Sequence, residues 1–190
     1  MLKQTPSQTI GPFFHMGIPR GVENILADAD TRGEQICITG QVLDGEAKPV
    51  VDALVEIWQA DSGGHFNHPL DPQRSQADPH FHAFGRCDTV NDGRFSFQTV
   101  RPGSLPDKKG HMQAPHIDVR IFARGMLIHA LTRLYFPGEA ANETDPVLNS
   151  ITETARRRTL IATPVNAGDL PTYCFDIHLQ GDQETVFFEP

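Results

Sequence analysis

The sequence predicts an antiparallel β-sandwich with long loops, an extended N-terminal arm and one or two short helices. Glycine and proline are plentiful, with 16 and 15 copies in 190 residues, as is typical of short strands joined by turns. About seven segments have the two-residue period of a strand, and helical patterns are few. We expect one domain spanning residues 1–190, since a chain of this length can bury a substantial core.

The predicted strands follow one another between turn signals. Apolar residues at alternate positions mark the strands, and Asp44-Gly45 and Asn91-Asp92-Gly93 mark two of the turns. Pro115 favours an extended start for the strand that contains it. The strands are expected at Gln35–Leu43, Leu54–Ala60, Arg94–Val100, Gln113–Gly125, Met126–Phe136 and Tyr173–Gln180.

Between these strands we expect two loops and the helical region. Asp61–Cys87 is long and rich in histidine, and a loop of about 25 residues in a compact domain is more often functional or interfacial than filler. Ser104–Met112 is expected as a polar loop. Asp145-Pro146 has the composition of a helix start, so short helices are expected at Val147–Ile151 and Thr154–Leu160.

Residues 1–20 form the predicted arm. Thr5–Gly17 has neither a helical nor an alternating pattern, yet Ile10, Phe13, Phe14 and Met16 are strongly apolar. So much apolar surface in an extended segment indicates that the segment packs on something. From the residues alone, the arm either folds back on its own domain or lies on a neighbouring chain.

Composition excludes several classes of partner. The formal net charge of −8 argues against a nucleic-acid partner, because binding to phosphates needs a basic surface. No apolar run approaches the roughly 20 residues that span a bilayer, and Met1–Gly21 lacks the apolar segment of a signal peptide. The three cysteines are widely spaced and odd in number, which argues against a disulfide framework. We therefore expect a cytoplasmic protein that does not bind membranes.

One strand carries a pattern typical of half a metal site. His116, Asp118 and Arg120 are two residues apart and therefore share a face of Gln113–Gly125. A ferric ion also favours anionic oxygen such as tyrosinate. The chain has only two tyrosines, Tyr135 within a predicted strand and Tyr173 at the start of another, and neither is in a loop beside His116.

Two other groups of residues are candidate binding sites, one for a metal and one for an anion. The long loop contains His65, His68, His80 and His82, but no third ligand stands at a spacing that indicates a metal site. Arg124 lies at a strand end beside a glycine, where a guanidinium either binds an anion in bidentate fashion or forms a structural ion pair with one of the 24 acidic residues. The motifs of phosphate loops and of serine nucleophile elbows are absent from the sequence.

Eight segments in order along nearly the whole chain give it a resemblance to the intradiol ring-cleavage dioxygenases. They are Thr5–Phe13, Gly40–Val42, Val55–Asp61, Val100–Gly103, Ala114–Ile117, Phe122–Gly125, Thr132–Phe136 and Glu184–Phe188. In iron-bearing members of this family, two tyrosines and two histidines hold a non-haem ferric ion. The resemblance implies that Phe66 and Leu105 stand at the tyrosine positions, and His116 and Asp118 at the histidine positions. We therefore expect this chain to bind no metal and to hold no complete catalytic site.

The resemblance also implies a partner. Heteromeric members pair a subunit without iron, called α, with an iron-bearing β subunit of the same fold, which would carry the Fe(III) here. The arm of α helps to line the β-subunit site, so Thr9, Gly11 and Pro12 are expected at the substrate pocket, and Phe13 stands where relatives can have tyrosine. Arg124 matches an arginine that faces this pocket and favours a carboxylate on the substrate. Two alternatives stay open, a β-sandwich scaffold protein without catalytic role and a metal protein that uses the loop histidines.

Overall fold

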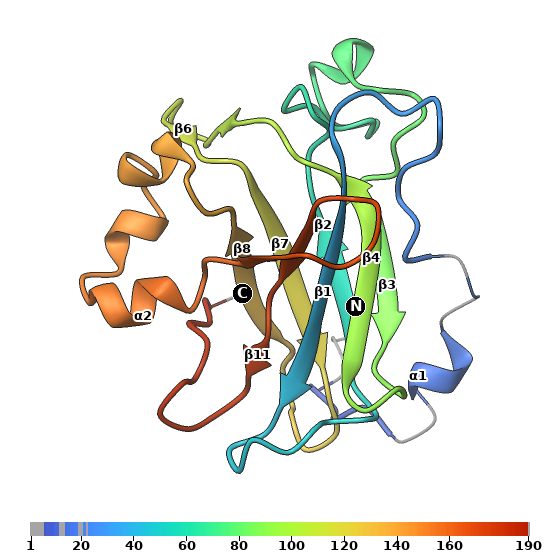
Figure 1. Cartoon of the computed structure of the whole chain (residues 1–190), viewed down its shortest axis with the longest axis vertical. Coiled ribbons are helices and arrows are strands. Elements are labelled where there is room, and N and C mark those ends of the chain that lie inside the picture. Colours follow the sequence, from blue (N-terminus) through green and yellow to red (C-terminus); the bar gives the residue numbers. More distant parts are fainter. Residues whose placement is uncertain (1–5, 12–13, 19–20, 22, 190) are drawn as a thin grey trace, which may run out of the picture.

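Two sheets packed face to face form the body of the molecule, with β1 and β4 in front of β2 and β7 in Figure 1. The computed structural model describes residues 6–11, 14–18, 21 and 23–189. In the first sheet, the strands are β11 (Ile177–His178), β1 (Gln35–Leu43), β10 (Thr172–Cys174), β9 (Thr163–Val165) and β4 (Arg94–Val100), the last of which pairs with β1. The second has the order β3 (Phe84–Asp88), β2 (Leu54–Trp58), β7 (His116–Phe122) and β8 (Ala130–Tyr135).

The core lies between the sheets and is built by the predicted alternation of side chains. In β1 every second residue is buried, and β4 and β7 supply inward-facing aromatic and β-branched residues. Burying each such side chain contributes roughly 1.5–3 kcal/mol to the free energy of unfolding. The largest fully buried members of this core are Phe97, Phe136, Leu26, Ile36, Ile38, Ile117, Ile121, Leu134 and Ile177.

Gly40 is the inward-facing position of β1 that has no side chain. A Cβ atom there would lie 2.0 Å from the carbonyl oxygen of Phe175 and 2.7 Å from the ring of Phe95. Because the backbone of Phe175 is fixed by its hydrogen bond to Thr39, we expect Gly40→Ala to lower the free energy of unfolding by about 2 kcal/mol or more. Urea unfolding measures this, with Gly17→Ala as control because a Cβ at Gly17 meets open space. Equal unfolding midpoints would contradict the prediction.

The pairing of the last strands differs from the prediction in two ways. The predicted strand Tyr173–Gln180 is divided into β10 and β11, and both run parallel to β1. Between them, the carboxylate of Asp176 accepts the N–H of Gln41 at 3.0 Å, so a side chain replaces a backbone carbonyl in the ladder. An alternating pattern specifies which face a residue occupies but not the direction of the neighbouring strand, which is why the parallel pairs were not predicted.

Two segments expected as loop contain strands. β3 begins at Phe84, inside the predicted loop Asp61–Cys87, and pairs along its whole length with β2. Its glycine and arginine at the second and third positions interrupt the alternation by which a strand is recognised. At the two ends of the predicted polar loop Ser104–Met112, the short strands β5 (Leu105–Pro106) and β6 (Met112–Gln113) pair with each other in antiparallel fashion.

Helix is scarce, as predicted. The expected helix at Thr154–Leu160 is α2 (Thr154–Arg158), while the segment Val147–Ile151 contains only a 3-10 turn, η3 (Leu148–Ser150). Two other 3-10 turns are η1 (Arg74–Gln76) and η2 (Ala140–Glu143). The arm, predicted as extended, contains the short helix α1 (Phe14–Gly17), which lies on the opposite side of the molecule from α2 in Figure 1. Within the described part of the chain, every helix is too short or too polar to cross a bilayer.

Candidate functional site

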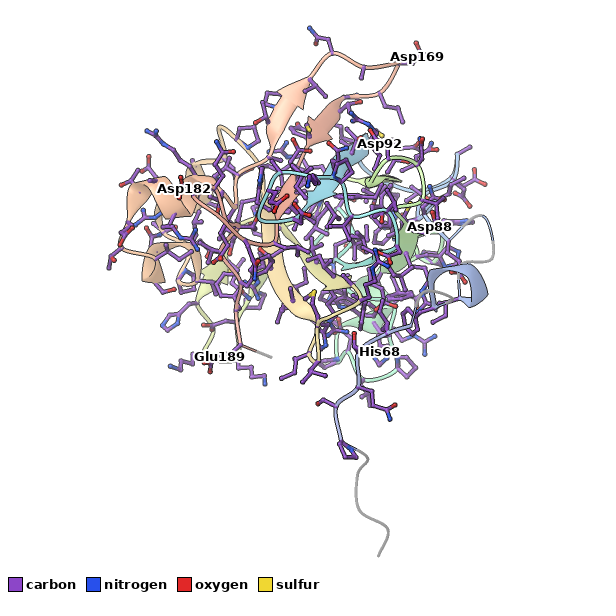
Figure 2. The ribbon with its side chains drawn as sticks, turned by 90° about the horizontal axis from the view of Figure 1, so that it is seen from below. His68, Asp88, Asp92, Asp169, Asp182 and Glu189 are labelled. Carbon is purple, nitrogen blue, oxygen red and sulfur yellow. The ribbon has the colours of Figure 1, made fainter. Side chains whose placement is uncertain are left out.

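An aromatic pocket surrounds Trp58 at the end of β2. The ring of Phe66 is stacked on Trp58 with centroids 5.5 Å apart and planes 9° apart, and the ring of His68 meets Trp58 edge-on at 6.1 Å. Phe66, Leu105 and Trp58 line one cavity of about 640 Å³, near the end of the molecule where Figure 2 labels His68. Two positions that the sequence predicted at a former metal site therefore come together.

The other two predicted positions lie on β7, the strand that pairs with β2. In the pairing of β2 with β7, Asp118 is directly opposite Trp58. Nε2 of His116 is 4.0 Å from Oδ1 of Asp118. Strand pairing therefore puts Asp118 next to Trp58, and His116 lies beside Asp118.

His116 is a neutral, buried imidazole. Its Nδ1 is 2.7 Å from the carbonyl oxygen of Ala114, an acceptor, so the proton is assigned to Nδ1, and Nε2 carries the lone pair. Burial lowers the pKa of His116 below its ordinary value, and the nearby guanidinium of Arg133 lowers it further. Both effects favour the uncharged ring.

Arg133 on β8 is the cation of this region. Its Nε donates to Oδ1 of Asp118 at 2.9 Å and its Nη1 donates to Oε1 of Gln113 at 2.7 Å. The side chain is only 20% exposed. Burial opposes the charge on Arg133, but Asp118 and other neighbours outweigh it and raise the pKa of the guanidinium above its usual value. Arg133 is thus positively charged and held in place.

The residues at the four positions do not fit a ferric ion. Phe66 and Leu105 offer no donor atom, and Asp118 already binds the guanidinium of Arg133. A ferric ion needs hard anionic oxygen together with imidazole, and His116 alone supplies a free nitrogen donor. Asp118 and Arg133 form an ion pair beside the aromatic pocket, and the four positions are not a set of iron ligands.

Both tyrosines are engaged elsewhere. The ring of Tyr135 lies beside His116, with centroids 5.7 Å apart, an adjacency that the sequence did not suggest. Its hydroxyl donates to Asp145 at 3.1 Å, and burial raises its pKa above the ordinary value. The hydroxyl of Tyr173 accepts a hydrogen bond from Arg101 at 2.9 Å. Both phenol hydroxyls therefore already have hydrogen-bond partners, Asp145 for Tyr135 and Arg101 for Tyr173.

The arm and Arg124 form a second predicted site. The backbone N–H of Gly125 donates to Oγ1 of Thr9 at 2.8 Å, and the ring of Phe14 packs 6.0 Å from that of Phe122. The described residues of the arm therefore fold back on their own domain, which is one of the two placements considered above. Gly11 is exposed, while Pro12 and Phe13 lie outside the described residues.

Arg124 makes the ion pair that the sequence left open as an alternative. Its Nε is 2.9 Å from Oδ2 of Asp52, whose side chain is only 12% exposed. The arginine side chain itself is 69% exposed. Asp52 was not singled out in the sequence, because nothing in its loop indicates which arginine it meets.

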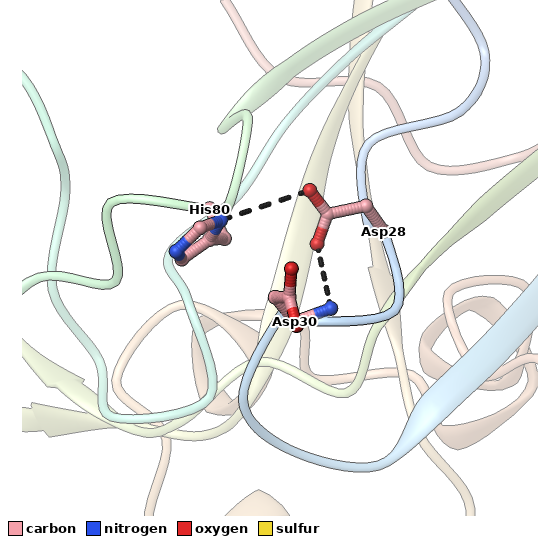
Figure 3. Close-up of side chains that lie close together, drawn as sticks. All are labelled: Asp28, Asp30 and His80. Atoms are coloured by element: carbon pink, nitrogen blue, oxygen red, sulfur yellow. Dashed lines mark hydrogen bonds and ion pairs between the residues drawn. The ribbon is translucent and has the colours of Figure 1, made fainter.

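The loop histidines do not converge. Among the described residues, His80 joins Asp28 and Asp30 in an exposed cluster whose ligand atoms lie within 4.8 Å of one another (Figure 3). Oδ1 of Asp28 already accepts the N–H of Asp30 at 2.9 Å and the hydroxyl of Thr31 at 3.0 Å, so this carboxylate stabilises its own turn. His68 instead lines the aromatic pocket.

Comparisons with known proteins agree with the fold. A family model described as a dioxygenase matches residues 10–181. The chain belongs to the intradiol ring-cleavage dioxygenase family.

Full-length relatives are protocatechuate 3,4-dioxygenase alpha chains. That of Pseudomonas putida is 41% identical over 201 residues, covering 100% of this chain and 98% of the relative, and that of Burkholderia cepacia is 40% identical, covering 99% and 98%. The beta chain of the Burkholderia cepacia enzyme is 33% identical, covering 94% of this chain and 77% of the relative. Among solved structures, the dioxygenase domain of a carbohydrate-binding fusion protein from Streptomyces sp. SirexAA-E is 30% identical with a TM-score of 0.65, covering 94% of this chain and 99% of that one. The predicted family and fold are confirmed.

Proposed function

We propose that this chain is the α subunit, without iron of its own, of a heteromeric protocatechuate 3,4-dioxygenase. The observation that carries the proposal is the pocket around Trp58, where Phe66 and Leu105 present hydrocarbon and Asp118 is bound to Arg133. The full-length similarity to alpha chains supports it. An iron-bearing β subunit of the same fold would hold the Fe(III).

The assembled enzyme would open the ring of protocatechuate between its two hydroxyl-bearing carbons. Both atoms of O2 enter the product, 3-carboxy-cis,cis-muconate. We place this reaction in the cytoplasm, a proposal supported by three cysteines that are all free.

This chain would contribute its arm and Arg124 to the substrate pocket of the partner. Thr9 binds the backbone next to Arg124, which supports a joint role for the two. For Gly11 and Pro12 the proposal rests on the family resemblance. Asp52 binds Nε of Arg124, and the exposed side chain leaves its remaining N–H groups able to pair with a carboxylate. A substrate carboxylate would thus be recognised by a guanidinium whose direction Asp52 fixes.

Co-expression with the β subunit tests the proposal. We expect the two chains to copurify, iron to be present at one ion per pair, and ring cleavage to require both chains. The matched experiment expresses this chain alone. Stoichiometric iron and ring cleavage by this chain alone would overturn the proposal, and failure to bind any β subunit would favour the scaffold alternative.

Deleting Met1–Phe14 separates the catalytic role of the arm from a structural one. The described residues of the arm make one hydrogen bond to the domain, from Gly125 to Thr9, and the ring contact of Phe14, so the isolated chain should lose little thermal stability. Turnover of the assembled enzyme should fall by at least about tenfold, because the arm would wall the substrate pocket. A large loss of stability with unchanged turnover of the folded fraction would make the arm a structural element.

A further inference from the structure

The guanidinium of Arg133 is bound to Asp118, whose carboxylate lies beside the imidazole of His116. We propose that Gln113, His116 and Asp118 form a cation site whose occupant is the guanidinium of Arg133, and that removing this guanidinium opens the site to a divalent transition-metal ion. The inference rests on the contacts of this chain alone and holds whether or not it assembles with a partner.

Asp118 and Gln113 bind the guanidinium directly, and His116 lies beside Asp118. Nε of Arg133 is 2.9 Å from Oδ1 of Asp118, and Nη1 of Arg133 is 2.7 Å from Oε1 of Gln113. Nε2 of His116 approaches the same Oδ1 atom at 4.0 Å. Donors about 2.0–2.2 Å from a tetrahedral ion lie roughly 3.3–3.6 Å apart, so Nε2 and Oδ1 would need to approach by about half an ångström to share one ion.

The second nitrogen of His116 is bound in the way that orients metal-binding imidazoles. Its Nδ1–H donates to the carbonyl oxygen of Ala114 at 2.7 Å, and the ring is 5% exposed. Such a hydrogen bond fixes the tautomer and leaves the Nε2 lone pair as the donor. His116 is therefore oriented as a metal-binding imidazole is, with the lone pair of Nε2 available to a cation.

Charge balance explains why the site is closed in this chain. Asp118 is about one-third exposed, and a partly buried carboxylate is stabilised by a positive charge nearby. Arg133 supplies that charge, and a metal ion at Nε2 of His116 would lie within a few ångströms of the guanidinium and be repelled by it. Without Arg133 the carboxylate would have lost its counter-ion.

The donor set defines the class of ion. One imidazole nitrogen, one carboxylate oxygen and one amide oxygen suit Zn²⁺, Co²⁺ or Ni²⁺, with water completing the coordination, and lack the anionic oxygen donors that a ferric ion prefers. Co²⁺ is the useful probe because its visible absorption reports coordination by protein nitrogen and oxygen.

The decisive experiment titrates the tag-free full chain with Co²⁺. Arg133→Gln removes the charge and keeps a side chain that fits beside Gln113. We expect this variant to bind Co²⁺ at least about tenfold more tightly than the wild-type chain, because the repulsion is gone, and to gain thermal stability on addition of Co²⁺. Arg133→His is the second variant, because two imidazoles and a carboxylate should bind the ion more tightly still.

Three controls assign the effect to the site. Arg158→Gln removes an exposed arginine of α2 and should leave Co²⁺ binding as in the wild type. Adding Asp118→Asn to Arg133→Gln should abolish the gain. Binding at the exposed cluster of Asp28, Asp30 and His80 is common to all variants and is measured in the wild type.

Two results would overturn the inference. One is a wild-type chain that binds Co²⁺ at Asp118 as tightly as Arg133→Gln, since the guanidinium would then not exclude the ion. The other is the absence of any gain in both Arg133→Gln and Arg133→His, including failure of Co²⁺ to restore folding if either variant is unfolded.

Discussion

Replacing Arg124 by alanine in the assembled enzyme is expected to raise KM for protocatechuate about 10- to 100-fold, the loss that follows when a charge-assisted hydrogen-bonded pair is removed. KM for a catechol without the carboxylate should stay within about threefold, because that substrate presents no anion to the guanidinium. The measurement is steady-state kinetics of the heteromer on both substrates.

Controls for this experiment come from the ion pair and from the surface. Asp52→Asn retains Arg124 but weakens the bond that directs it, so it should raise KM for protocatechuate less than Arg124→Ala does. Arg158→Ala removes one exposed positive charge from α2 and should change neither KM. Equal rises in KM on both substrates would remove Arg124 from recognition of the carboxylate.

Asp145→Ala is expected to destabilise the chain by about 3–5 kcal/mol, the largest loss of stability we predict. Asp145 is fully buried, and its carboxylate accepts the N–H groups of Ala114, Val147 and Leu148 at 2.7–2.9 Å and the hydroxyl of Tyr135 at 3.1 Å. Removing the carboxylate leaves three buried donors and one part-buried donor, the N–H of Val147, without this acceptor. Urea unfolding at constant pH measures the change.

Asp169→Ala is the matched control for Asp145→Ala. Asp169 is exposed in the turn between β9 and β10, at the edge of the molecule opposite His68 in Figure 2, so its removal should change the free energy of unfolding by less than about 0.5 kcal/mol. Similar losses in the two variants would show that net charge, not the buried carboxylate, determines stability.

The strands whose bounds could be predicted are those that turn one face to the core and the other to solvent. Gln35–Leu43 and Arg94–Val100 have the predicted bounds, because each alternates between buried and exposed residues without interruption. β3 escaped notice because Gly85 and Arg86 break its pattern, and the division between β10 and β11 depends on a bond from Gln41 to Asp176 across 135 residues. Local patterns do not contain such long-range partners.

The candidate site was predicted as a set of positions, not as a set of bonds. His116 and Asp118 were found because their spacing puts them on one face, and Phe66 and Leu105 followed from the family resemblance. Arg133 was missed because its role depends on standing opposite Asp118 in the pairing of β7 with β8. The same strand pairing puts Tyr135 beside His116, which no spacing within β7 reveals.

The bond between Thr9 and Gly125 affects how the chain would meet a partner. A free arm would have to be ordered at the moment of association, and that loss of conformational freedom would weaken binding. With the hydroxyl of Thr9 fixed on the backbone beside Arg124, part of this ordering is complete before the partner arrives. The arm and the guanidinium would then reach the substrate pocket as one preorganised unit, so a change at either one should be felt at the other.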